Sequence, residues 1–140
     1  MLKLSSGFVE KNGQNRVQPI NAGQLTKLLA NELGANLKLN LLSGHPEFNG
    51  DRMDNYFVEN FYIPLSEWGY EIRKHAATDC LMYAAAKNSY HPVVDDLKRI
   101  ENDKSIQPIE LGKVATNYLK TNDELYDAML STWLIGAVAR

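Results

Sequence analysis

The sequence predicts a mainly α-helical (α+β) fold with about six helices and one small β-hairpin. Apolar residues recur every three to four positions along most of the chain, and one short segment alternates between apolar and polar residues instead. At 140 residues the chain has the size of one domain. Hydrophobic residues make up 44% and charged residues 23% of the composition, which is ordinary for globular proteins and excludes a disordered chain.

The first twenty residues are predicted to be a separate N-terminal segment, 1–20, that is extended at first and partly flexible around the polar stretch 11–16. Residues 21–140 are predicted to form a single mostly helical domain, because no linker or internal repeat divides them.

The first helix is predicted over residues 21–33. Asn21 can cap it, Gln24 occupies the reciprocal capping position, and four leucines share one stripe before Gly34 ends the helix. Apolar and polar residues then alternate, and a return strand follows turn-forming residues, so the hairpin is predicted over residues 37–50.

A second helix is predicted over residues 53–68, with a kink or break near Asn60. The reason is Pro64, which removes a backbone hydrogen bond and clashes with the carbonyl group four residues earlier. The next predicted helix, 75–87, is rich in alanine and carries one charge in its middle, so we expect it to lie in the core.

Three further helices are predicted in the remaining sequence. Pro92 suits the first turn of a short helix, and Pro108 opens another. The last helix is predicted from Asp123 to the C-terminus, with Asn122 or Thr121 as its cap.

The end of the last helix is apolar around its whole circumference, and no polar tail follows it. We expect this end to be covered by the domain itself, by a continuation of the chain or by a partner. The predicted docking residues are Trp133, Leu134, Val138 and Arg140.

Charge and cysteine usage narrow the function classes. Six basic and seven acidic side chains in residues 1–70, and nine and ten in residues 71–140, give a formal net charge of −2, which argues against a dedicated basic nucleic-acid binder. One cysteine, no N-glycosylation acceptor and no apolar run of membrane-spanning length predict a cytoplasmic protein without membrane contact.

The sequence contains no motif for catalysis or for nucleotide or metal binding. Gly112 and Lys113 form the one Gly-Lys pair, and the first glycine of a phosphate-binding loop is missing before them. His45, His75 and His91 are too far apart to match a metal-binding spacing. The acidic pairs and the lone cysteine are explained by helix ends and by core packing. We therefore expect no catalytic residue, metal or cofactor in this chain.

One hypothesis for nucleic-acid binding remains. A predicted helix, a turn at Gly69 and the 75–87 helix have the layout of a helix-turn-helix motif, with the 37–50 hairpin available as a wing. The candidate contacts at the start of the second helix are Arg73, Lys74 and His75. The alternative is a plain helical hairpin with solvated ends, which the apolar character of the second helix favours.

Two segments resemble a known family. The first is an N-S-Y-H-P-V segment with the motif residues Asn88, Ser89, Tyr90, His91, Pro92, Val93 and Leu97, and the second is the apolar run at residues 133–140. Over roughly residues 35–140 the chain resembles the virulence-associated E family, the replication proteins of phages, plasmids and genomic islands. Asp96 departs from the family pattern, which often has Tyr there.

In that family a P-loop ATPase domain of helicase type follows the second segment directly. The resemblance implies a non-catalytic helical module of a mobile-element DNA replication protein, which orients or oligomerises the motor domain and has DNA as a further contact. The implied partner is the P-loop ATPase domain of its own or another chain, with a homo-oligomer as a second option, and ATP and magnesium belong to that domain alone. The alternative is a stand-alone, helix-turn-helix-like DNA-binding or protein-docking regulator.

Overall fold

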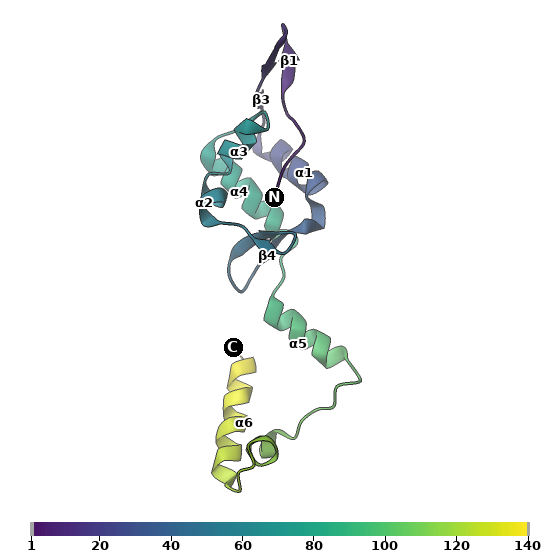
Figure 1. Ribbon diagram of the computed structural model, residues 1–140, viewed down its shortest axis with the longest axis vertical. Helices are drawn as coiled ribbons and strands as arrows, with labels where there is room; N and C mark the ends of the chain where they lie inside the picture. The colour runs from purple at the N-terminus through teal and green to yellow at the C-terminus, as the bar shows by residue number, and fades with distance from the viewer. Residues whose placement is uncertain (1, 140) are drawn as a thin grey trace. The chain divides into compact units, whose positions relative to one another are not determined.

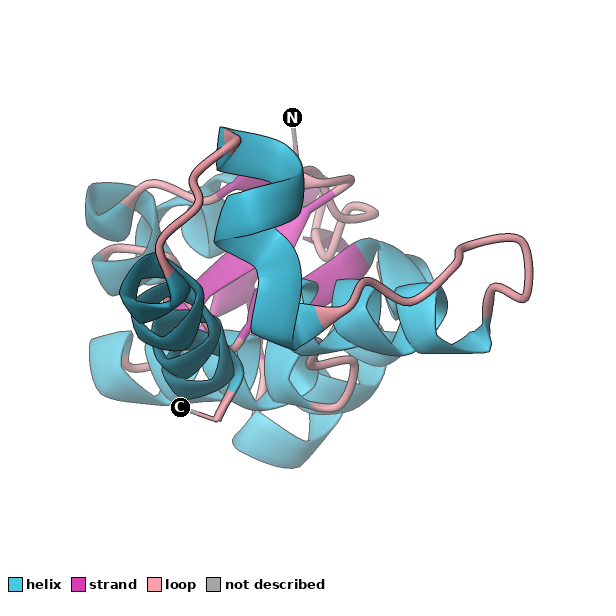
Figure 2. Cartoon of the chain, turned by 90° about the horizontal axis from the view of Figure 1, so that it is seen from below, coloured by secondary structure: helices cyan, strands magenta, loops and turns pink. Residues whose placement is uncertain are grey.

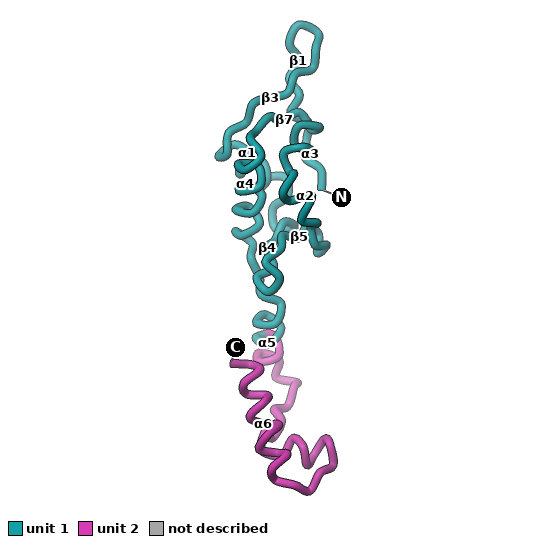
Figure 3. The backbone as a smooth tube through the Cα atoms, turned by 90° about the vertical axis from the view of Figure 1, so that its left-hand side faces the viewer, with its two compact units in different colours: residues 1–98 teal, residues 99–140 magenta. Residues whose placement is uncertain are grey.

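A computed structural model describes residues 2–139 and shows a mainly α-helical (α+β) fold, as predicted. Helices make up most of the chain (Figure 2). The contacts divide the chain into two compact units, unit 1 (residues 1–98) and unit 2 (residues 99–140) (Figure 3). The N-terminal segment 1–20, predicted to stand apart, belongs to unit 1, and the region predicted as one domain contributes to both units.

Unit 1 holds most of the secondary structure (Figure 1). Its helices are α1 (Ala22–Glu32), the 3-10 turn η1 (Gly34–Asn36), α2 (Asn55–Glu59), α3 (Tyr62–Glu67) and α4 (Lys74–Ala86), and α5 (Pro92–Asn102) begins in it. Its strands are β1 (Val9–Lys11), β2 (Gln14–Arg16), β3 (Gln18–Pro19), β4 (Leu37–Asn40), β5 (His45–Phe48), β6 (Asp51–Arg52) and β7 (Tyr70–Glu71). They form an antiparallel β1–β2 hairpin, a parallel β3–β7 pair and an antiparallel β4–β5–β6 sheet.

Helix α4 lies at the centre of unit 1 and contacts α1, α2, α3, β4 and β5. Small side chains let these elements approach it closely. Its buried residues are Ala77, Cys80, Leu81, Ala84 and Ala85. The prediction that the alanine-rich helix lies in the core is therefore confirmed, and Cys80 is a buried core residue.

Two local signals set helix ends as predicted. At α1, the Gln24 backbone N–H donates to the Asn21 side chain over 2.9 Å, and the Asn21 N–H donates to the Gln24 side chain over 3.0 Å. The predicted 53–68 helix is broken into α2 and α3 at Asn60, and Pro64 occupies the first turn of α3, where its missing N–H costs no helical hydrogen bond.

The N-terminal segment packs more tightly than predicted. Leu2 and Leu4 are buried in the core of unit 1, as the period of two in a strand-like stretch allows. Residues 9–16 form the β1–β2 hairpin instead of an irregular loop. Asn12 and Gly13 occupy its turn with φ angles of 54° and 72°, the conformation that an Asn-Gly pair favours in a two-residue hairpin turn.

Unit 2 contains the 3-10 turn η2 (Leu111–Lys113), the π-helical turn η3 (Ala115–Leu119) and α6 (Glu124–Val138). The helix predicted from Pro108 is replaced by these two turns. In a regular helix the Thr116 N–H would bond to the carbonyl four residues earlier, whereas here it donates to the Asp127 carboxylate over 3.0 Å. The cap of α6 is Asp123, which accepts from the Leu125 N–H, and neither Asn122 nor Thr121 has that role.

None of the helices within residues 2–139 is long and apolar enough to cross a lipid bilayer.

Candidate functional site

The segment that starts at Asn88 leads from α4 to α5, and Asn88 itself ties two elements of unit 1 together. The Asn88 side-chain amide donates to the carbonyl oxygens of Gly34 over 3.0 Å and of Leu37 over 3.1 Å. The Gly34 carbonyl precedes β4, and the Leu37 carbonyl belongs to its first residue. Asn88 therefore holds the C-terminal end of α4 against the start of β4.

Tyr90 extends the same connection through both its backbone and its side chain. Its N–H donates to the Leu39 carbonyl over 3.0 Å, and its carbonyl accepts from the Leu41 N–H over 2.9 Å, so it lies alongside β4. Its hydroxyl donates to Glu47 Oε2 over 2.6 Å, and Asn40 Nδ2 donates to Glu47 Oε1 over 2.9 Å. The hydrogen bond to Glu47, with smaller contributions from burial and from the carboxylate charge, raises the pKa of the Tyr90 phenol.

The rest of the motif caps α5. His91 Nδ1 accepts from the Val94 N–H over 3.3 Å, while the His91 N–H donates to Asp95 Oδ2 over 3.2 Å, which is a reciprocal cap around Pro92. The motif residues without such a role are exposed: Ser89, Val93 and Leu97. Within residues 2–139 no three His, Cys, Asp or Glu side chains gather in a way that could hold a metal ion.

The three candidate nucleic-acid contacts lie together at the start of α4. Arg73 precedes the first turn, Lys74 and His75 are in it, and all three side chains are exposed. Lys74 Nζ donates to Asn60 Oδ1 over 3.3 Å. Helix α3, a turn at Gly69 with φ of 94° and helix α4 reproduce the predicted order of helix, turn and helix. DNA contact by these residues stays a prediction.

The hairpin expected as a wing lies at the other end of α4. Leu37 of β4 bonds to Asn88, which follows the last residues of α4, and a helix of 13 residues is about 20 Å long. The β1–β2 hairpin lies instead at the end where α4 begins, because β3 pairs with β7 just before Arg73 (Figure 1). Sequence reasoning missed this hairpin, although the Asn12-Gly13 pair was the signal that could have found it.

The predicted docking residues divide by exposure. Trp133 and Val138 are each 66% exposed on α6, whereas Leu134 is half-buried. Arg140 lies outside the described residues. Two open apolar hollows flank α6 within unit 2. One, of about 430 Å³, is lined by Leu119, Tyr126, Met129 and Trp133 among others, and one of about 500 Å³ by Ile109, Leu111, Leu134, Ile135 and Val138 among others.

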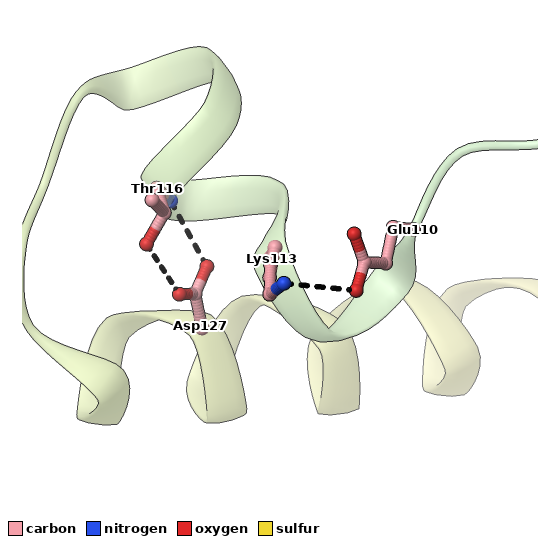
Figure 4. A network of polar contacts seen from close by, with 4 residues as sticks. All are labelled: Glu110, Lys113, Thr116 and Asp127. Atoms are coloured by element: carbon pink, nitrogen blue, oxygen red, sulfur yellow. Dashed lines mark hydrogen bonds and ion pairs between the residues drawn. The ribbon is translucent and has the colours of Figure 1, made fainter.

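A buried carboxylate fixes α6 to η3 within unit 2. Asp127 Oδ1 accepts from the Thr116 N–H over 3.0 Å, and its Oδ2 accepts from the Thr116 hydroxyl over 2.6 Å (Figure 4). These hydrogen bonds favour the charged form and lower the pKa of Asp127. Nearby, Lys113 Nζ and Glu110 Oε1 form an exposed ion pair at 3.3 Å, which contributes little stability (Figure 4).

The structure thus gathers the predicted residues into separate groups. Asn88 and Tyr90 lie against β4, the basic trio lies at the opposite end of α4, and the exposed docking residues lie on α6 in unit 2. Comparisons of the chain with protein-family models, with curated proteins and with solved structures found no match.

Proposed function

We propose that the chain is a non-catalytic docking module of a DNA replication protein, and that unit 2 binds a P-loop ATPase domain through the apolar surface of α6. The observation that carries the proposal is the exposure of large apolar side chains in unit 2. The resemblance to the virulence-associated E family supplies the class of partner. In this proposal ATP and magnesium are bound by the partner domain, and the module orients or oligomerises it.

Unit 2 has few buried apolar side chains of its own. Among residues 99–139 the buried hydrophobic residues are Val114 and Ala115. A unit of about forty residues is at the size where a core alone rarely suffices for stability and where a partner is commonly needed. A partner that buries the exposed apolar side chains of unit 2 would therefore stabilise this unit.

The exposed surface is large for a unit of this size. Leu119, Tyr126, Met129 and Trp133 line one hollow, and each is more than half exposed. An aromatic side chain buries about 150–250 Å², so the two aromatic residues alone leave about 250 Å² in water. With the other two side chains the patch reaches the range of about 300–600 Å² that is typical of the largest patch on a whole monomer.

Helix α6 also lacks the polar face that a surface helix normally has. From Ala128 to Ala139 it carries no charged residue, and both of its acidic residues lie in its first turn. Leu125, Met129 and Trp133 follow one another at spacings of four and point away from the face that holds Asp127. A protein partner with an apolar surface fits this helix.

The test is isothermal titration calorimetry of the full chain with a purified P-loop ATPase domain of a virulence-associated E protein. We expect the wild-type chain to bind and Trp133→Ser to weaken binding about thirtyfold, as for a central aromatic anchor. The matched control is Tyr56→Ser, because Tyr56 is an aromatic residue of unit 1 with similar exposure.

Absence of wild-type binding, or equal losses in Trp133→Ser and Tyr56→Ser, would contradict the proposal. Sedimentation of the chain alone adds a further check. If it forms a dimer that Trp133→Ser dissociates, a second copy covers α6 and the proposed ATPase partner is wrong.

A further inference from the structure

The β1–β2 hairpin is an arm whose side chains take no part in the core of unit 1. All residues from 9 to 16 are exposed, and none belongs to the core cluster. The hairpin extends beyond the helices of unit 1 at the end where α4 begins (Figures 1 and 3). Its side chains are therefore available to a partner outside the chain.

Both strands of the arm are clamped at their base. The Gly7 N–H donates to the Trp68 carbonyl over 2.7 Å, and the Gln18 N–H donates to the next carbonyl, that of Gly69, also over 2.7 Å. A side chain at Gly7 would collide with the Tyr70 ring, and one at Gly69 would collide with the backbone of Phe8. The arm is thus held in a defined direction at its base.

The register of the hairpin separates its charges onto two faces. Val9 pairs with Arg16 and Lys11 pairs with Gln14, and these residues share one face because paired residues and alternate residues of a hairpin point the same way. Glu10 pairs with Asn15 on the other face. One face therefore carries both cations and an amide, and the only carboxylate of residues 9–16 lies on the opposite face.

The cations of this face are free to bind. Within residues 2–139 neither Lys11 nor Arg16 takes part in a hydrogen bond or an ion pair through its side chain. At the base of the arm, β3 pairs with β7, and two further exposed cations, Arg73 and Lys74, come one residue after β7. Glu71 of β7 is an exposed carboxylate at the base, so Lys11, Arg16 and Glu10 on the arm and Arg73, Lys74 and Glu71 at its base each leave one positive charge in excess.

We propose that the β1–β2 arm enters the major groove of double-stranded DNA, with Lys11 and Arg16 on phosphates or base edges and Gln14 on a base edge. The major groove is about 12 Å wide and about 8.5 Å deep, and it admits a two-stranded β-ribbon. Three residues per strand extend the arm by about 10 Å, which matches that depth. Arg73 and Lys74 would contact the flanking phosphates and fix the register.

The chemistry of the arm favours duplex DNA over other polyanions. Single strands are bound by aromatic side chains on which bases stack, and the cationic face has none. The major groove of an RNA duplex is too deep and narrow for side chains to read. An acidic protein would match the lysine and arginine but makes no particular use of the arm's length or of Gln14. The inference does not depend on the docking proposed for α6.

The test is fluorescence anisotropy with the full chain and a labelled DNA duplex of about two helical turns, over salt concentrations from about 50 to 200 mM. The test variant is Lys11→Gln/Arg16→Gln. The control variant Lys27→Gln/Lys87→Gln removes the same charge from exposed positions on α1 and after α4, and Glu10→Gln alters the opposite face of the arm. Circular dichroism checks that each variant is folded.

We expect the wild-type chain to bind the duplex, and the test variant to reduce the slope of log affinity against log salt by about two and to weaken binding at least about tenfold at low salt. The Lys27/Lys87 variant should weaken binding no more than about twofold, and Glu10→Gln should not weaken it. The inference is overturned if the wild-type chain does not bind, if both double variants lose affinity equally, or if single-stranded DNA, an RNA duplex or polyglutamate competes as well as the DNA duplex does.

Discussion

Unit 1 encloses a core of buried apolar side chains and exposes others, such as Tyr56, whereas unit 2 leaves most of its large apolar side chains in contact with water. The core cluster of the protein lies entirely within residues 2–85, around α4. In unit 2 the buried Asp127 carboxylate joins α6 to η3 through its hydrogen bonds to Thr116. The side chains of Trp133, Ile135 and Val138 on α6 are more than half exposed. The two units therefore differ although the composition of the whole chain is ordinary. Unit 1 packs around its own core, and the apolar surface of unit 2 suits association with a partner.

The largest expected effect compares an aromatic residue from each unit. Phe61 is fully buried, and the centroid of its ring lies 5.7 Å from that of Phe57 and 6.2 Å from that of Trp68. Phe61→Ala should lower the free energy of unfolding by about 3–5 kcal/mol because it leaves a cavity. Trp133→Ala should change it by about 0.5 kcal/mol or less, as for a surface position. Urea unfolding followed by circular dichroism measures both, and similar losses would show that unit 2 has a core of its own.

A smaller effect tests whether Asn88 stabilises unit 1. Asn88→Ala removes two hydrogen bonds and leaves the carbonyl groups of Gly34 and Leu37 without this donor, which should cost about 1–3 kcal/mol of unfolding free energy. Ser89→Ala is the matched control, because Ser89 is exposed in the same segment. The same urea experiment applies. Equal values for the two variants would mean that the motif has no structural role at Asn88.

The smallest effect is confined to acid pH and to unit 2. Because Thr116 lowers the pKa of Asp127 in the folded protein, the contact stabilises η3 against α6 above the ordinary pKa of an aspartate and is lost as the pH falls through the lowered value. An NMR titration of the Asp127 carboxyl carbon should give a pKa below about 3.9. Thr116→Val should raise that pKa, and an unchanged titration would contradict the assignment of the hydrogen bond as its cause.

The features that the sequence predicts are those with local causes. The Asn21 cap, the break before Pro64 and the buried alanine-rich helix each depend on residues within one or two helical turns. The apolar circumference at the end of the last helix is also a local pattern, whereas the exposure of Trp133 and Val138 is decided by the fold, because the sequence left open whether the domain itself covers them. Such signals can be recognised in one sequence because the interacting residues are close neighbours.

The features that the sequence does not reveal depend on distant contacts. The helix expected from Pro108 is displaced because Thr116 bonds to Asp127 on another element. The hydrogen bonds of Asn88 and Tyr90 to Leu37 and Leu39 of β4 cross some fifty positions, so their structural role is not visible in the sequence. The β1–β2 hairpin is an exception, because its signal, the Asn12-Gly13 turn, is local. The polar composition of residues 11–16 favoured a flexible loop instead.

The parallel pairing of β3 with β7 has a consequence for the order of folding. Gln18 of β3 pairs with Tyr70 of β7, so this pair can form only after residue 70 has been synthesised and the chain between the two strands has closed into a loop. Contacts between residues so far apart form slowly, because the loop between them must first be closed at a cost in entropy. During synthesis from the N-terminus, α1 can begin to form early, but the base of the arm has no partner until residues 68–71 have been made. Strand β3 thus precedes α1 in the chain but reaches its final place only after β7 has been made.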